Sequence, residues 1–208
     1  MKQFDTAIII AGGKSTRMGF DKAFMRIGNS YCIELLIRKL KKNFNEIIIV
    51  TENSKKHDFM NDAITDFMNV TITSDIIKNA GPLGGLHAGL KASSSMHNYL
   101  VACDMPVISD ELIVHMKDLL FLKPDIIACE NNGFIEPFHA VYMKPLISKI
   151  EREVKTGNYS LYNLMLKSNT EIIPFDKLKK ICKSLSLFTN LNTRQELNRF
   201  IKEVDYTG

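Results

Sequence analysis

Short apolar runs rich in isoleucine and valine recur along this chain of 208 residues, with helical patterns between them. Continuous apolar runs, as opposed to alternating ones, are typical of strands covered on both faces, and parallel sheets contain such strands. The pattern therefore predicts an α/β fold with three Rossmann-like layers, in which a mostly parallel sheet carries helices on both faces. The strands expected in the first part of the chain are residues 6–10, 46–51, 70–73, 99–103 and 126–129.

Helical periodicity separates these runs. Ile33, Leu36, Ile37 and Leu40 form one apolar stripe in a helix expected over residues 30–42. Thr193 and Glu196 have the spacing of a capping box and start the last helix. The remaining elements expected are a short helix within 52–69, helices from 81, over 110–121, 146–155 and 160–167, and strands at 138–142 and 187–191.

The first apolar run leads directly into a glycine-rich, cationic loop. Residues 11–22 read AGGKSTRMGFDK, with three glycines and two of the cations at Arg17 and Lys22. Glycines let main-chain N–H groups approach an anion closely, and the two cations offset its charge. The segment predicts a loop that holds the phosphates of a nucleoside triphosphate, although a tight strand-to-helix turn with a basic edge is the plainer alternative.

The spacing excludes two better-known phosphate loops. A P-loop needs a glycine five residues before Gly13, and that position is Ile8. The dinucleotide-binding motif has the spacing Gly-x-Gly-x-x-Gly, whereas the glycines after Gly12 are Gly13 and Gly19. The segment is therefore neither of these two phosphate loops.

Acidic residues follow two of the expected strands. Asp75 comes after the run 70–73, and Asp104 follows the apolar run 99–103. Ligands of open parallel sheets bind outside the carboxyl ends of the strands, and Mg²⁺ takes one or two carboxylates plus phosphate oxygens. Asp104 is therefore the candidate Mg²⁺ ligand, with a helix or turn cap as the alternative.

The pattern Ala-Gly-Gly-x-Ser-x-Arg-Met-Gly-x-Asp-Lys, read from Ala11 to Lys22, resembles the signature loop of molybdenum cofactor guanylyltransferases. These belong to the wider nucleotidyltransferase family, so the resemblance implies a fold of the nucleotide-diphospho-sugar transferase type. Further segments similar to family motifs are 136–140, which read EPFHA, and 190–193, which read NLNT.

The resemblance also implies roles for individual residues. Arg17, Lys22 and Asp104 match the catalytic residues, and Asp104 matches the metal ligand. Thr51 stands where several members have asparagine, and Arg194 stands where proline is common. The positions that match nucleotide-binding residues are Ile10, Ala11, Gly12, Gly13, Lys22, Thr51, Asp75, Asp104 and a second glycine-rich turn with Gly81, Pro82, Leu83 and Gly84.

The reaction implied is transfer of GMP from GTP to molybdopterin, with release of pyrophosphate. A related nucleotidyltransferase that uses CTP, or a sugar or polyol phosphate as the acceptor, stays open. A nucleotide-binding module without catalysis is a more remote alternative. Proteins of molybdenum cofactor biosynthesis and molybdoenzyme chaperones are the partners that the resemblance suggests.

Composition limits the remaining possibilities. The length predicts one domain over 1–208, with nucleotide binding in about 1–130 and acceptor binding in about 131–208. The net charge of +4 is spread along the chain and does not predict nucleic-acid binding. No apolar run approaches the ~20 residues of a membrane span, and the first strand begins too early for a signal peptide, so we expect a cytoplasmic protein without a membrane partner. The four cysteines form no Cys-x-x-Cys pair.

Overall fold

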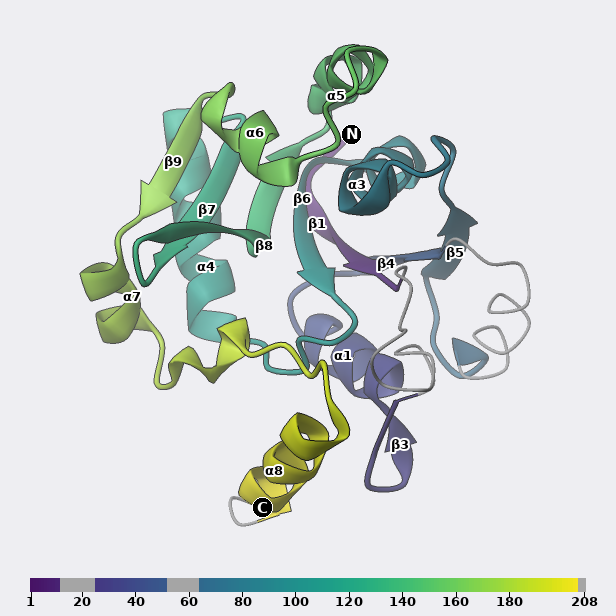
Figure 1. The fold of residues 1–208 in the computed structure, drawn as a ribbon, viewed down its shortest axis with the longest axis vertical. Coiled ribbons are helices and arrows are strands. Elements are labelled where there is room, and N and C mark those ends of the chain that lie inside the picture. Colours follow the sequence, from purple (N-terminus) through teal and green to yellow (C-terminus); the bar gives the residue numbers. More distant parts are fainter. Residues whose placement is uncertain (12–24, 52–63, 206–208) are drawn as a thin grey trace.

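The computed structural model describes residues 1–11, 25–51 and 64–205, which form one central sheet covered by helices (Figure 1). In the described residues this sheet has seven strands, in the order β5-β4-β1-β6-β8-β7-β9. All neighbouring strands are parallel except the two pairs made by β8. The strands are β1 (Lys2–Ile10), β4 (Glu46–Thr51), β5 (Val70–Ser74), β6 (Ser95–Ala102), β7 (Ile126–Asn131), β8 (Phe134–Met143) and β9 (Thr170–Ile173).

Helices cover both faces of the sheet, as the apolar runs predict. One face packs against α3 (Gly81–Ala92), α5 (Leu146–Lys155) and α6 (Leu161–Leu166). The other face packs against α1 (Cys32–Leu40), α4 (Asp110–Leu119) and α7 (Phe175–Ile181). Strand β1 alternates between the two cores, since Ile8 and Ile10 contact the first layer and Ala7 and Ile9 the second. The three-layer α/β fold is therefore confirmed.

Helix α3 lies unusually close to the central strand. A Cβ atom on Gly89 would be 2.5 Å from Ile8 Cγ2, a fully buried atom of β1. Glycine at this position lets the helix backbone approach the sheet. The same approach brings the first turn of α3 toward the carboxyl ends of the strands.

Local sequence signals set several helix boundaries. The stripe expected in α1 is buried, with Ile33, Leu36, Ile37 and Leu40 all facing the core. The capping box before α8 (Arg194–Asp205) is confirmed, because Thr193 Oγ1 accepts the Glu196 N–H at 3.1 Å and Glu196 Oε2 accepts the Thr193 N–H at 2.8 Å. Each such cap satisfies donors that the helix cannot pair itself.

The prediction of a strand over 187–191 is wrong. Residues Leu185–Phe188 form the 3₁₀ helix η3, whose start is capped because Ser184 Oγ accepts the Ser186 N–H. Leu187 and Phe188 are both buried in the same core, on the α1 side of the sheet, whereas consecutive side chains of a strand would point to opposite faces. Phe188 packs edge to face with His139 of β8.

Other differences concern short or polar segments. Strand β9 and helix α7 were not expected, and neither was the small hairpin of β2 (Arg26–Ile27) and β3 (Ser30–Tyr31). The end of the helix expected over 110–121 is a separate 3₁₀ turn, η2 (Leu120–Leu122). The short helix expected within 52–69 falls largely outside the described residues. Among the described residues, no helix combines the length and apolar character needed to cross a membrane.

Candidate active site

Four parallel strands of the sheet end side by side. The side of the sheet formed by their carboxyl ends is called the carboxyl edge, as distinct from the edge strands β5 and β9. The Ala11 N–H donates to Val50 O at 2.8 Å, and the Cys103 N–H donates to Ile10 O at 3.0 Å. These bonds align the ends of β1, β4 and β6, and β5 follows β4 in register up to its last residue. The chain winds away from β1 in both directions, toward β4 and toward β6, which makes this edge a topological switch point. It brings together the predicted site residues Ile10, Ala11, Thr51, Asp75 and Asp104.

Thr51 ends β4 with a buried hydroxyl. Its side chain is 0% exposed, and Oγ1 has no hydrogen-bond partner in the part of the chain that the structure describes. A buried polar group without a partner costs free energy that a bound ligand can recover. The position of this hydroxyl at the switch point is therefore evidence for a ligand contact.

Asp75 lies beside the first turn of α3. It is 6% exposed, and its Oδ2 is 3.8 Å from where a Cβ on Gly84 would lie. That Cβ would also be 2.9 Å from Ile77 O, so only glycine fits at position 84. Gly81–Gly84 form the start of α3 itself, not a separate turn before it. Leu83 has its side chain in the core, so only its main chain is available to a ligand.

Asp104 follows β6 in the connection to α4. It is 8% exposed, and its main-chain carbonyl accepts the Leu191 N–H at 2.9 Å, which ties the C-terminal segment to this edge. Burial raises the pKa of the neighbouring Cys32 thiol to about 12, and the Asp104 charge adds to this effect. The Asp104 carboxylate therefore lies close to the beginning of α1.

The donor set at this edge fits a magnesium ion shared with a substrate. The described residues contain no group of three or more His, Cys, Asp or Glu side chains that could hold a metal by themselves. Mg²⁺ does not require such a cage, because one or two carboxylates with water and phosphate oxygens complete its shell. Asp104 supplies a carboxylate of this kind, and a transition-metal site is not indicated.

Glu136 on β8 is a further acidic residue at this edge, which the sequence reasoning placed in a motif without giving it a role. It pairs with Cys129 near the end of β7, and its Oε1 accepts the Phe138 N–H at 3.1 Å. Partial burial raises the pKa of its carboxyl group, and repulsion from Asp104 adds to the increase. The two carboxylates are therefore near one another, although 31 residues separate them in the sequence.

The loop predicted to hold phosphates lies outside the described residues. This applies to Gly12, Gly13, Arg17 and Lys22. The residues on either side are described: Ala11 and Met25 are both buried in the core that faces α1. The roles expected for the loop stay predictions.

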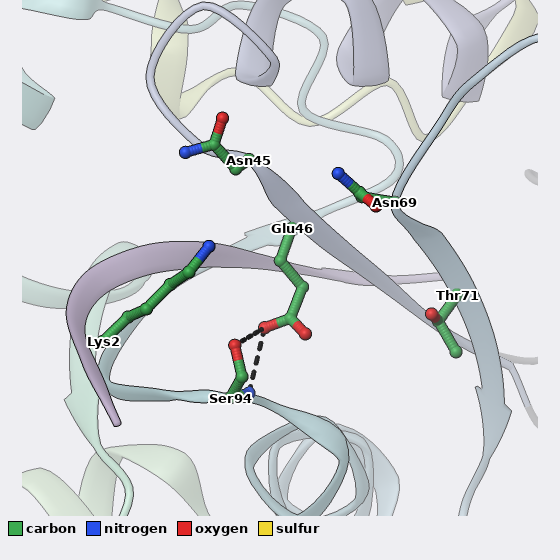
Figure 2. A pocket seen from close by; sticks show the side chains of 6 residues that line it. All are labelled: Lys2, Asn45, Glu46, Asn69, Thr71 and Ser94. Atoms are coloured by element: carbon green, nitrogen blue, oxygen red, sulfur yellow. Dashed lines mark hydrogen bonds between the residues drawn. The ribbon is translucent and has the colours of Figure 1, made fainter.

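A polar pocket lies at the opposite edge of the sheet (Figure 2). It is formed where β1, β4 and β5 begin, and Glu46 Oε2 accepts the Ser94 N–H and hydroxyl at 3.0 and 2.9 Å. Since open parallel sheets bind ligands at the carboxyl ends of their strands, this pocket is not the candidate site. The residues that line it are Lys2, Asn45, Glu46, Asn69, Thr71 and Ser94.

Residues 7–170 match the family model described as the MobA-like NTP transferase domain. A protein of Peptoclostridium acidaminophilum named "Probable molybdenum cofactor guanylyltransferase" is 40% identical over 205 residues, which covers 96% of this chain and 89% of that protein. A second relative, "Molybdenum cofactor guanylyltransferase" of Syntrophotalea carbinolica, is 34% identical, over 97% of this chain and 92% of its own length.

A solved structure with the same fold is molybdopterin-guanine dinucleotide biosynthesis protein A from Archaeoglobus fulgidus. It superposes with a TM-score of 0.81 at 22% sequence identity and covers 98% of this chain and 100% of its own. At this identity the likeness shows the fold alone.

Proposed function

The chain belongs to the family of MobA-like NTP transferase domains, and we propose that it is a molybdenum cofactor guanylyltransferase, which transfers GMP from GTP to molybdopterin. The observation that carries this proposal is the meeting of Thr51, Asp75 and Asp104 at the carboxyl edge of the sheet, on both sides of the strand that leads into the cationic loop. The relatives that carry this name align over nearly the whole chain.

The order of the strands suggests how GTP would lie. Base and ribose would bind at the ends of β4 and β5, where the Thr51 hydroxyl has no partner among the described residues and Asp75 lies beside α3. The triphosphate would bind at the loop after β1, with Arg17 and Lys22 as its cations. Asp104, at the end of β6, would then face the α-phosphate from the acceptor side.

The reaction needs no protein nucleophile. The terminal phosphate of molybdopterin attacks the α-phosphorus of GTP in line, the bond to the β-phosphate oxygen breaks, and pyrophosphate leaves. Arg17 and Lys22 offset the negative charge that gathers on the phosphate oxygens, and the surrounding residues hold the two phosphates in line. Bound at Asp104, Mg²⁺ would neutralise the phosphate oxygens as a Lewis acid.

We also propose that the two parts of the chain bind different substrates. We assign nucleotide binding to residues up to about 130 and acceptor binding to the part from about 131 onward, which contributes β8 and the segment before α8. Partners in molybdenum cofactor biosynthesis, molybdoenzyme chaperones and a cytoplasmic location belong to the same proposal.

The test is incubation of the purified protein with GTP, Mg²⁺ and molybdopterin, followed by detection of pyrophosphate and of the guanine dinucleotide by mass spectrometry. The proposal predicts both products in equal amounts and a strong preference for GTP when CTP competes in the same vial. Pyrophosphate release with a sugar or polyol phosphate but not with molybdopterin would favour the alternative acceptor. Equal use of CTP would remove the guanine assignment.

A further inference from the structure

Strand β8 brings a second set of side chains to the candidate site from the opposite direction. It runs antiparallel to β6 and β7, so its first residues lie where the parallel strands end. Phe134 pairs with Asn131, and Glu136 pairs with Cys129 near the carboxyl end of β7. The beginning of β8 is thus at the same edge of the sheet as Asp104.

A bulge turns this part of β8 away from β6. Pairing with β6 ends at Leu100 and Ala140, before β6 itself ends. Between two consecutive pairs with β7, Ile127 with Val141 and Cys129 with Glu136, the chain of β8 advances five residues while β7 advances two. His139 in this bulge has a φ of +50°, and Tyr142 Oη donates to Pro137 O at 2.8 Å, which fixes the bulge.

The bulge leaves the Glu136 carboxylate held at the edge without a cationic partner in the described residues. Its Oε1 accepts the Phe138 N–H at 3.1 Å, and no ion pair of the described residues includes it. The side chain is about half-buried, and among the described residues the carboxylate of Asp104 acts on its charge. The other oxygen of Glu136 has no hydrogen-bond partner in the part of the chain that the structure describes, and a carboxylate held in this way can accept hydrogen bonds from N–H donors.

The chemistry of the two substrates limits what this carboxylate can contact. It repels phosphate groups, so it does not suit the triphosphate. Guanine and the pterin ring of molybdopterin both carry a ring N–H beside an amino group, and this pair of parallel donors matches the two oxygens of a carboxylate. Glu136 therefore suits one of these two rings.

The strand order separates the two rings. The predicted guanine contacts, Thr51 and Asp75, end β4 and β5, and β8 lies four strand positions from β5, on the other side of β6. At about 4.8 Å per strand this is roughly 19 Å, whereas the end of β1, at Ile10, is two strand positions from β8, or about 10 Å. A ring at Glu136 is thus within reach of the phosphates but not of the guanine position.

We propose that Glu136 is a specificity-determining residue that accepts hydrogen bonds from the ring N–H and 2-amino group of the pterin in the acceptor substrate. This inference rests on the proposed function. The motif at 136–140 then has a role in recognising the acceptor. Glu136 holds the acceptor on the Asp104 side of the phosphates.

The test compares two small probes, pterin and lumazine, which has an oxygen in place of the 2-amino group. Each is used as a competitor of molybdopterin in the guanylyl-transfer assay with GTP and Mg²⁺. The unmodified protein should bind pterin at least about tenfold more tightly than lumazine, because an unmatched buried carboxylate disfavours the analogue. Glu136→Gln should lose most of this preference and raise the KM for molybdopterin about tenfold, with a KM for GTP that changes less than about twofold.

Glu130→Gln is the matched control, since Glu130 lies on β7 at the same edge, pairs with Ile135 and is also partly exposed. It should leave the pterin preference unchanged. The inference is overturned if Glu136→Gln keeps the full preference for pterin over lumazine. It is also overturned if the substitution instead raises the KM for GTP or the Mg²⁺ concentration that the reaction needs. Equal binding of pterin and lumazine by the unmodified protein would also overturn the inference. This measurement does not depend on the folding of any variant.

The two proposals can fail separately. If the unmodified protein forms the guanine dinucleotide and Glu136→Gln still prefers pterin, only the inference about Glu136 is wrong. If no dinucleotide forms, the proposed function is wrong. The preference is then read directly from the intrinsic fluorescence of the two probes on binding, and its absence overturns the inference as well.

Discussion

Replacing Thr51 with valine should stabilise the ligand-free protein and weaken GTP binding at the same time. The Thr51 hydroxyl is fully buried and has no hydrogen-bond partner in the described residues, and valine has nearly the same shape without it. An unpaired buried hydroxyl costs about 1–3 kcal/mol, so the free energy of unfolding should rise by about 1 kcal/mol. For a chain of this size that corresponds to an increase of roughly 2–4 °C in Tm.

The same change should remove one hydrogen bond to the nucleotide. A neutral hydrogen bond contributes about 0.5–1.5 kcal/mol, so the Kd for GTP should increase by roughly twofold to twelvefold. Calorimetric titration with GTP and Mg²⁺ measures this directly. The rise in Tm on adding GTP should be correspondingly smaller for the variant than for the unmodified protein.

Thr6→Val is the matched control, because Thr6 is equally buried but its hydroxyl is paired. Thr6 Oγ1 is 2.7 Å from Ser95 Oγ and also contacts the Glu46 carboxylate. Its loss should lower the free energy of unfolding by about 1–3 kcal/mol and leave GTP binding unchanged. If Thr51→Val lowers the Tm as Thr6→Val does, the Thr51 hydroxyl is already satisfied within the protein and the argument for a ligand contact is refuted.

Three further predictions concern the core, the pH dependence and the loop. Gly89→Ala should lower the free energy of unfolding by about 1–2 kcal/mol in urea denaturation, since its Cβ would be 2.5 Å from Ile8 Cγ2. Gly85→Ala should be nearly neutral, because its Cβ would be 3.1 Å from the terminal Ile10 Cδ1, a milder overlap that the higher helix propensity of alanine offsets. Burial lowers the pKa of His139 from 6.5 to about 3. Between these pH values the unfolded chain binds a proton that the native state does not bind. The free energy of unfolding therefore falls by about 1.4 kcal/mol per pH unit as the pH drops from 6.5 toward 3. His139→Gln should flatten this slope in denaturation curves at pH 4.5 and 6.5, and an unchanged slope would show that other groups cause it. Lys22→Ala should lower the rate of guanylyl transfer by roughly a hundredfold, and an unchanged rate would remove its catalytic role.

The central strands and their layers could be predicted because their burial is continuous. Runs such as 46–51 are apolar on both faces, so each predicts a strand whatever its neighbours are, and this strand has the expected bounds. The edge strand β9 was missed because only Ile173 of its four residues is buried. Strand β8 was recognised only in its buried second half, and its bulge depends on contacts with Tyr99, Phe188 and β7 that no local pattern encodes.

The candidate site was predictable where it follows strand ends and unpredictable where it depends on strand order. Asp75 and Asp104 follow apolar runs, so the general behaviour of parallel sheets places both at one edge. The proximity of Glu136 to Asp104 could not be inferred in this way. Strand β8 follows β7 in the sequence but lies between β6 and β7 in the sheet, and no local pattern indicates this order. The Thr51 hydroxyl, which has no partner among the described residues, likewise could not be recognised from sequence, because its surroundings depend on the three-dimensional structure.

The most direct test of the whole account is the rate of guanine dinucleotide formation by Asp104→Asn, measured at several Mg²⁺ concentrations. Asp118→Asn, on the exposed surface of α4, is the control. The account predicts that Asp104→Asn folds normally but loses roughly a hundredfold in rate, with part of the loss recovered at high Mg²⁺, while Asp118→Asn behaves like the unmodified protein. Full activity of Asp104→Asn at the same Mg²⁺ concentration would contradict it.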